Sequence, residues 1–270
     1  MMTSRPVSLS YFAKQTDTSS IIRGQNFTVE CIIGAAGSDH AIHSDHETIL
    51  ILPESGATLA SDFETADIAA RSIAVVPAGS ARLTLPEGAR AYALTTARIG
   101  TDPLNVVNST DYQTLDERVL PIAKPMERLA KDERQIRVYP VDEVPFPDGN
   151  PRLKFFQSAT MSINWVEYDG QRDRTKLSPH SHDDFEQGSL AITGDFVHHI
   201  RTPWASNAEL WREDQHIEAS AGSMAIIPPE LIHTTEGVGP GQHILIDVFA
   251  PPRTDFIAKG WVFNAGDYRG

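Results

Sequence analysis

Short runs of β-branched and other apolar residues recur along this chain of 270 residues, and most of them end at Gly or Pro. Examples are NFTVECIIG and ETILILPESG in the first fifth of the chain and HILIDVFAPP near its carboxyl terminus. Runs of this length, with few helical periods between them, are typical of antiparallel strands in sandwiches or barrels. The pattern therefore predicts an all-β fold.

The composition of the chain argues against several classes of protein. Apolar residues make up 40% and charged residues 22%, which allows a sizeable core and disfavours wholesale disorder. Lys and Arg total 23 against 36 Asp and Glu, the net charge is -13, and no basic run offers a track for phosphates. We therefore expect no nucleic-acid partner, although an anionic substrate is not excluded.

The amino-terminal segment and the only cysteine bear on where the protein works. MMTSRPVSLSYFAKQ lacks the apolar core of a secretory signal, and no apolar stretch of the sequence is long enough to span a bilayer. A cytoplasmic protein without a membrane partner is the expectation. Cys31 cannot form an internal disulfide and, inside an apolar run, is expected to be a small buried side chain without chemistry.

A change in composition near the middle of the sequence divides the chain. Between about 101 and 150 the charges have helix-like spacing that Pro residues interrupt, and a Pro-rich stretch follows. Such a segment is typical of a linker with one or two short helices. We predict a first domain over residues 1–105, a partly helical, Pro-rich linker over 106–150, and a second domain over 151–270.

The segment LSPHSHDDFEQGSL, at residues 177–190, carries the strongest chemical pattern in the sequence. Side chains two apart along a strand point to one face, so His180 and His182 would project together, and Glu186 keeps this parity if the strand continues. Imidazole nitrogen and carboxylate oxygen suit divalent first-row metals. The spacing indicates three metal ligands or, alternatively, polar residues that are hydrogen-bonded in a barrel mouth without a metal.

A second pattern begins at Gly222, where the chain reads GSMAIIPPELIH, with Pro228 before a final His233. Together the two segments resemble the motifs of the cupin superfamily. The first family motif is HxH followed by Glu and a later Gly, and the second is Gly, five residues, Pro-x-Gly and a final His. The departure is Glu230, which stands where the family usually has glycine. The resemblance covers most of residues 155–252.

By this resemblance the chain is a bicupin, with two RmlC-like jelly-roll β-barrels and one divalent metal ion, Fe, Mn, Ni or Zn, in the second barrel. The implied metal ligands are His180, His182, Glu186 and His233. Three imidazoles and one carboxylate leave one or two coordination positions for water or substrate, as in catalytic sites. The resemblance implies no other cofactor.

The first half resembles a degenerate copy of the second. The aligned positions are Ala41 with His180, His43 with His182, Glu47 with Glu186, and Arg82 with His233. Two of the four donors are therefore missing, although His40 and His46 leave a rearranged site open. The similar turns VVPAGSAR and IIPPELIH indicate a weak internal repeat. We expect the first barrel to support the fold, dimerise or cover the mouth of the second.

Further candidates lie between the two motifs, in an interval 12 residues longer than its counterpart in the first half. Insertions in barrels commonly form loops over the mouth. There Arg201 could hold a substrate carboxylate through two parallel hydrogen bonds. Of the neighbours His198 and His199 only one can face the interior of a regular strand; we take His199 as the catalytic candidate, with Glu186. Asp247 could orient a ligand imidazole.

The family resemblance implies a metal-dependent enzyme for a small polar organic acid or a sugar-derived substrate. The ligand set suits an isomerase, a hydrolase or a decarboxylase, or a dioxygenase with ferrous iron. Two alternatives stay open: a protein that binds or senses a small ligand without turnover, and a structural partner whose metal site is a remnant. Exposed β edges, and the frequency of dimers among cupins, lead us to expect a homodimer.

Overall fold

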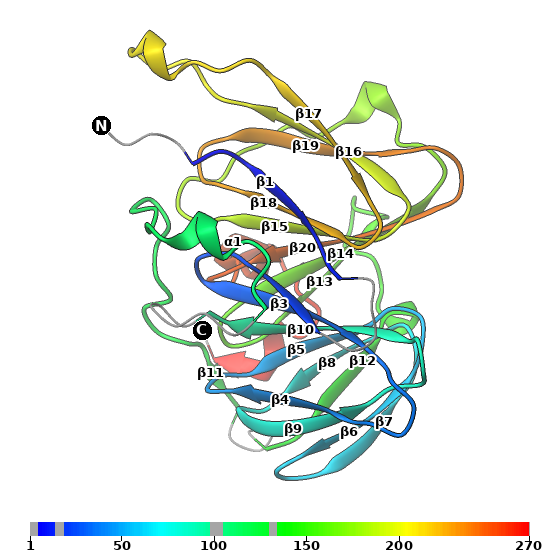
Figure 1. Cartoon of the computed structure of the whole chain (residues 1–270). Coiled ribbons are helices and arrows are strands. Elements are labelled where there is room, and N and C mark those ends of the chain that lie inside the picture. The colour runs from blue at the N-terminus through cyan, green and yellow to red at the C-terminus, as the bar shows by residue number, and fades with distance from the viewer. Residues whose placement is uncertain (1–4, 14–18, 98–104, 130–133, 270) are drawn as a thin grey trace.

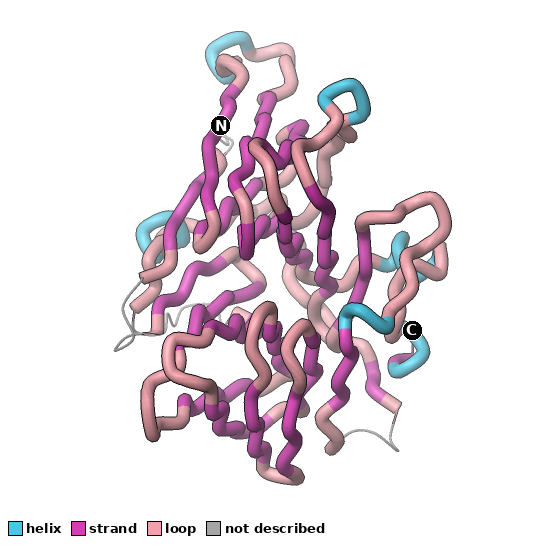
Figure 2. The backbone as a smooth tube through the Cα atoms, turned by 90° about the vertical axis from the view of Figure 1, so that its right-hand side faces the viewer, coloured by secondary structure: helices cyan, strands magenta, loops and turns pink. Residues whose placement is uncertain are grey.

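The computed structural model describes residues 5–13, 19–97, 105–129 and 134–269, and this part of the chain is nearly all β. Antiparallel strands form two groups, one above the other in Figure 1 and again in the view turned by 90° in Figure 2. Within the described part the one α-helix is α1 (Thr254–Ala258), and no helix there is long and apolar enough to cross a membrane. The predicted all-β class is confirmed.

The lower group in Figure 1 consists of a six-stranded and a four-stranded sheet from the N-terminal half. The six strands, in spatial order, are β12 (Arg137–Pro140), β8 (Ser72–Val76), β5 (Thr48–Leu52), β10 (Arg90–Thr96), β3 (Phe27–Ile33) and β2 (Ser20–Arg23). The four strands are β4 (His40–Ser44), β9 (Gly79–Thr84), β6 (Ala57–Ser61) and β7 (Thr65–Ile68).

The upper group repeats this plan with strands of the C-terminal half. Its six-stranded sheet has the order β1 (Ser8–Tyr11), β18 (Ser223–Ile227), β15 (Gln187–Thr193), β20 (Gln242–Phe249), β14 (Ser162–Asp169) and β13 (Leu153–Gln157). A three-stranded sheet of β17 (Gln215–Ser220), β16 (Asp195–Arg201) and β19 (Ile232–Val238) completes it. Outside both groups, β11 (Glu127–Arg128) pairs with β21 (Tyr268–Arg269).

The short 3-10 helices lie in the connections between these strands. They are η1 (Ser109–Tyr112), η3 (Val141–Glu143), η4 (Arg174–Lys176), η5 (Ala208–Leu210) and η6 (Ala265–Asp267). Two of them, η1 and η3, fall in the segment predicted as a partly helical linker. The insertion between the cupin-like motifs forms the loop from β16 to β17 that carries η5.

Two strands cross the predicted domain boundaries. β1 comes from the predicted first domain but pairs with β18 of the C-terminal sheet, and β12 comes from the predicted linker but pairs with β8 of the N-terminal sheet. The exchange is reciprocal, because each strand lies before one half in the chain and completes the sheet of the other. The predicted limits at residues 105 and 150 therefore do not coincide with the limits of the sheets.

The largest apolar core joins the two six-stranded sheets. In β5, Ile49 and Ile51 belong to the same buried cluster as Ile246 of β20, whereas Leu50 and Leu52 face the interior of the N-terminal barrel. Alternate side chains of a strand point to opposite faces. β5 is apolar at nearly every position because both of its faces are buried.

Candidate metal centre

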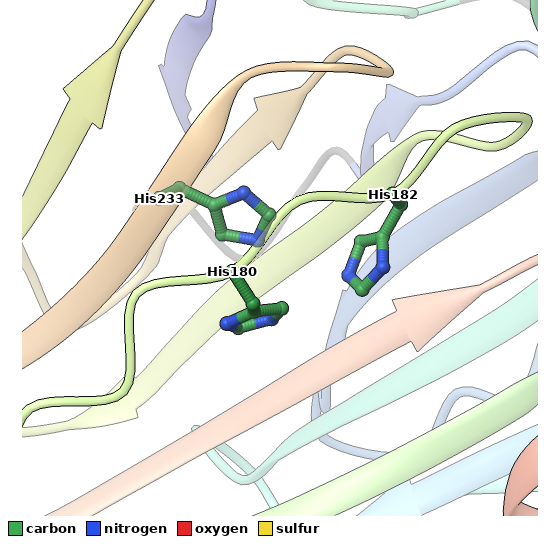
Figure 3. A group of neighbouring side chains, drawn as sticks. All are labelled: His180, His182 and His233. Atoms are coloured by element: carbon green, nitrogen blue, oxygen red, sulfur yellow. The ribbon is translucent and has the colours of Figure 1, made fainter.

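Three imidazoles come together inside the C-terminal half (Figure 3). His180 and His233 form an isolated antiparallel bridge, in which each donates its backbone N–H to the carbonyl of the other, at 3.0 and 2.7 Å. One ring nitrogen from each of these residues and one from His182 lie within 4.8 Å of one another. His182 and His233 are buried and His180 is exposed. The structure thus brings together three of the four predicted ligands.

Glu186, the fourth predicted ligand, does not join this cluster. Its buried carboxylate accepts hydrogen bonds from the backbone N–H of Gln25 at 2.6 Å, the Tyr112 hydroxyl at 3.2 Å and the Arg5 guanidinium at 3.1 Å. The parity argument fails because the chain bends over residues 183–185 and the next strand, β15, begins only after Glu186. Burial raises the pKa of this carboxyl group.

Gln187 provides the oxygen that we expected from Glu186. Its amide oxygen lies 2.9 Å from Nε2 of His182 and 3.1 Å from Nε2 of His233. The amide nitrogen donates to Ser189 Oγ and to Asp247 Oδ1, both at 3.1 Å, which fixes the oxygen toward the imidazoles. Asp247, considered above as a partner for a ligand imidazole, therefore orients this amide. Counting side-chain parity from the start of β15, and not from His182, would have identified Gln187 as the residue that faces the imidazoles.

Two of the three imidazoles, His180 and His233, have at Nδ1 the hydrogen bond that a metal ligand needs. Nδ1 of His180 lies 2.8 Å from the Ser178 carbonyl oxygen, and Nδ1 of His233 lies 2.9 Å from the Leu231 carbonyl oxygen. An Nδ1–H that donates to a carbonyl leaves the lone pair on Nε2, which is the atom free to coordinate. The backbone thus selects the tautomer that turns Nε2 toward the centre of the cluster.

The donor set fits a divalent cation. Burial lowers the pKa of His182 to about 3 and that of His233 to about 4, so both rings are neutral at pH 7. A neutral His233 that donates through Nδ1 has only a lone pair to offer to the Gln187 oxygen at 3.1 Å. Two acceptors that face each other are satisfied by a cation bound to both. The residues that would hold it are His180, His182, Gln187 and His233.

These four residues line a cavity of about 280 Å³ inside the C-terminal barrel. Much of its wall is apolar and aromatic, formed by Phe155, Phe196, Leu245, Phe249, Phe256 and Trp261. Asn164 and Asp247 add polar groups, and the Asn164 amide donates to Asp247 Oδ2 at 3.2 Å. Burial raises the pKa of the Asp247 carboxyl group. A carboxyl group of this kind, next to the donors, can exchange a proton with a bound molecule.

The predicted acid or base His199 does not line this cavity. Its Nδ1 lies 2.8 Å from Nδ1 of His216 and its Nε2 lies 3.0 Å from Glu236. Its neighbour His198 is the residue that points into the barrel, where it is buried and lies 2.9 Å from Thr235 Oγ1. Only the register of β16 decides which of the two neighbours faces inward, and the sequence does not fix that register.

Arg201 also lies outside the cavity that holds the four donors. Its guanidinium forms a two-pronged ion pair with Asp214, with Nη2 and Oδ2 2.6 Å apart, and both side chains are exposed. Arg201 and His199 line a second cavity of about 330 Å³, which shares His233 and Thr234 with the first. The proposed carboxylate contact of Arg201 is therefore already taken by a surface acid.

The first half keeps the backbone geometry of this site without its donors. Ala41 pairs with Arg82 across β4 and β9, as His180 pairs with His233. The Arg82 guanidinium lies on the surface, 3.1 Å from Asp39. Among the residues that the structure describes, the three histidines of the C-terminal half are the one group of three or more His, Cys, Asp or Glu that could hold a metal ion.

Comparison with known proteins identifies the fold. No family model matches the chain, and no curated protein matches it in sequence. An IolB-like protein from Salmonella typhimurium is similar in structure with a TM-score of 0.58 at 12% identity, covering 91% of this chain and 93% of its own. The E. coli protein YlbA is similar with a TM-score of 0.57 at 12% identity, covering 93% of each chain.

Bacillus subtilis oxalate decarboxylase, a protein with Mn(II) centres, has a TM-score of 0.53 at 11% identity and covers 90% of this chain and 77% of its own. These neighbours are cupin-fold proteins, and the all-β jelly-roll fold predicted from the sequence is therefore confirmed. At such identities the likeness defines the fold alone, and it assigns no reaction to this chain.

Proposed function

We propose that this chain is a metal-dependent bicupin enzyme that acts on a small organic acid or a sugar-derived substrate, with its chemistry in the C-terminal barrel. The observation that carries the proposal is the convergence of His180, His182, His233 and the Gln187 oxygen on one wall of a largely apolar cavity. Oxalate decarboxylase supports it, since a protein of the same fold has Mn(II) centres.

The two-barrel reading rests on the repeated strand order. β12, β8, β5, β10, β3 and β2 in one half correspond in order to β1, β18, β15, β20, β14 and β13 in the other. The pairing of Ala41 with Arg82 matches that of His180 with His233. We infer that only the second barrel carries the chemistry, because its counterpart lacks the ligand set.

The donor set suits an anionic substrate. A bound divalent ion would polarise a substrate carbonyl, hydroxyl or carboxylate as a Lewis acid. Because His180, His182, His233 and Gln187 are all uncharged donors, the charge at the site is not offset by its ligands, which favours a negatively charged substrate oxygen. Asp247 holds the Gln187 amide in place and, as the half-buried carboxyl group of the cavity, can exchange a proton with the substrate. Isomerisation, hydrolysis and decarboxylation each include a proton transfer that such a group can carry out.

Elemental analysis of the full chain, purified without added metal, tests the proposal. We expect close to one equivalent of Fe, Mn, Ni or Zn per chain in the wild type and less than about a tenth of this in His233→Ala. Arg82→Ala, at the matching position of the first half, is the control and should keep the metal. Absence of metal from the wild type, even after incubation with these ions, would rule out a metal-dependent enzyme.

The identity of the bound ion then reduces the number of possible reaction classes. Iron together with oxygen consumption indicates a dioxygenase, whereas manganese or zinc without oxygen consumption indicates an isomerase, a hydrolase or a decarboxylase. Asp247→Asn separates acid or base chemistry from metal binding when enough metal is added to fill the site despite the weaker affinity, and metal content and turnover of candidate acids are measured on the same sample. Loss of turnover with metal retained is the result expected for a proton-exchanging carboxyl group.

A further inference from the structure

Four cationic side chains line the same cavity as the metal donors. Two of them, Arg253 and Lys259, share the carboxylate of Asp255, at 2.7 and 3.8 Å. The other two, Arg152 and Arg172, form no ion pair with any carboxylate in the described part of the chain; the Arg172 guanidinium donates only to the Lys176 carbonyl, at 3.0 Å. The cavity therefore contains two guanidinium groups without an acid of their own.

The backbone holds these two arginines at the β14 and β19 side of the cavity. The carbonyl of Arg152 accepts the N–H of Glu167 at 3.0 Å, and the N–H of Arg172 donates to the carbonyl of Gly237 at 3.0 Å. Tyr168 lies between them, with its ring 5.8 Å from the Arg152 guanidinium and its hydroxyl accepting the N–H of Gly237 at 3.0 Å. Both arginines lie outside the strands, and one backbone hydrogen bond ties each of them to a strand residue, in β14 for Arg152 and in β19 for Arg172.

This pairing of like charges is unfavourable without an anion. Burial, and then the positive charge of Arg172, lower the pKa of Arg152, so the charged form of Arg152 is disfavoured in this position. Half-buried cations normally have an acid or carbonyl partner, because removal of the ion from water is unfavourable when no partner offsets it. Guanidinium groups offer paired N–H donors that match carboxylate and phosphate oxygens.

We propose that Arg152 and Arg172 form an oxyanion subsite, which holds a carboxylate or phosphate group of the substrate while another polar group of the same molecule lies beside His180, His182, His233 and Gln187. The contact beside the metal donors rests on the proposed function, whereas the contact with the two arginines does not. A cavity of about 280 Å³ limits the ligand to a small metabolite. The substrate is accordingly a small acid with its anionic group at one end and its reacting group at the other.

Isothermal titration calorimetry of the full chain tests the subsite, with malonate, inorganic phosphate and uncharged malonamide as probes. Each protein is titrated after loading with Mn(II) and again after treatment with a chelator, so that anion binding to the arginines is measured without the ion. The variants are Arg152→Met, Arg152→Lys and Arg172→Met. Arg82→Met, which removes an exposed arginine from the first half, is the matched control.

We expect one of the two anions, and not malonamide, to bind the chelator-treated wild type. Arg152→Met should weaken this binding by about tenfold or more, Arg172→Met by about threefold, and Arg152→Lys by an intermediate factor, because lysine keeps the charge but loses the paired donors. Arg82→Met should bind like the wild type. A preference for malonate identifies a carboxylate, and a preference for phosphate identifies a phosphoryl group.

Two results would overturn the subsite: no binding of either anion, or binding that survives both Arg152→Met and Arg172→Met in folded protein. Circular dichroism and the midpoint of thermal unfolding, recorded for each variant, show whether it is folded. Metal content of the same samples reports on the proposed function separately. Anion binding that depends on Arg152 in a chain that binds no metal would end the metal-enzyme proposal and leave the subsite in place.

Discussion

In the N-terminal half, aliphatic side chains fill the space between the six-stranded and four-stranded sheets, whereas the corresponding space in the C-terminal half holds the cavity. The strand register shows that a few substitutions of apolar by polar residues distinguish the two interiors. Leu50 pairs with Ala93 where β5 meets β10, and Ser189 pairs with Asp247 where β15 meets β20. Both members of the first pair are apolar and both of the second are polar. One backbone thus carries either a dry core or a polar site.

The two halves differ in donors but share a buried carboxylate. Glu47 accepts the N–H of Ala159 at 2.7 Å and the Tyr268 hydroxyl at 2.9 Å and pairs with Arg128 at 2.9 Å, and Glu186 does the same with Gln25, Tyr112 and Arg5. In each case the backbone N–H belongs to the first hairpin of the other half. The comparison teaches that the acid of the first motif links the two halves in both places, and that in neither place does it lie among the imidazole cluster.

The largest expected contrast between the halves is their response to acid. Burial lowers the pKa of His182 to about 3 and those of His198 and His233 to about 4, from an ordinary value of 6.5. Between pH 6.5 and about 4 the unfolded chain binds protons that the folded chain does not, so stability falls as the pH falls, by up to about 1.4 kcal/mol per pH unit for each imidazole. Urea unfolding of metal-free protein across this range measures the slope.

The variant His198→Gln isolates one of these imidazoles. Glutamine can keep a hydrogen bond to Thr235 but takes up no proton, so the variant should lose about a third of the acid sensitivity and gain stability relative to wild type as the pH approaches 4. His43→Gln, at an exposed position of the first half, should leave the slope unchanged. Equal slopes for wild type and His198→Gln would contradict the assignment of a buried neutral imidazole.

The next largest effect should be shared by both halves. Glu47→Gln and Glu186→Gln each remove a buried carboxylate charge that pairs with an arginine, Arg128 or the half-buried Arg5, and we expect each to lower the free energy of unfolding by about 3 kcal/mol. Chemical denaturation at pH 7 measures this, with Glu218→Gln on the exposed surface as the control. If Glu186→Gln instead removed the metal and left the stability unchanged, Glu186 would be a metal ligand and not a residue that links the two halves.

Metal affinity should depend on Gln187 and not on its counterpart in the first half. We expect Gln187→Ala to weaken metal binding by about 100-fold and Asp247→Asn by about tenfold, because the first removes a donor and the second loosens its orientation. Competition with a chromophoric chelator measures both. Thr48→Ala, at the matching position of β5, should have no effect. If Gln187→Ala lost less metal affinity than Glu186→Gln, the fourth ligand would be Glu186 and not Gln187.

The smallest effect concerns the turns that follow Pro77 and Pro228. The first uses Gly79 at φ 129°, where an added Cβ would lie 2.7 Å from Asp62, and the second uses Glu230 at φ 69°. Gly79→Ala should cost about 2 kcal/mol, since only glycine adopts that backbone region freely. Glu230→Gly should change stability by less than about 1 kcal/mol, because relief of the positive φ offsets the loss of the ion pair with Arg118 at 2.8 Å. Thermal unfolding compares the two, and a larger loss for Glu230→Gly would contradict this reading.

The sequence predicted the fold class and three imidazoles because both depend on short-range patterns. Alternating apolar runs report strands, and the bridge between His180 and His233 brings together two motifs that are each local. Gln187 escaped prediction because the position where β15 begins depends on the bend before it. Arg152 lies far from both motifs in the chain, and its place in the cavity follows only from the pairing of β13, β14 and β20.

The exchange of β1 and β12 between the halves makes the chain indivisible. A fragment ending within the linker would keep β1 without β18 and would lack the opposite sheet that covers Ile49 and Ile51. The second fragment would lack β1 along the edge of β18 and would carry β12 with nothing to receive it. Melting of either barrel therefore takes a strand from its neighbour, so the whole chain should unfold in one cooperative step, and the cavity with its arginines and histidines persists only as long as the entire molecule does.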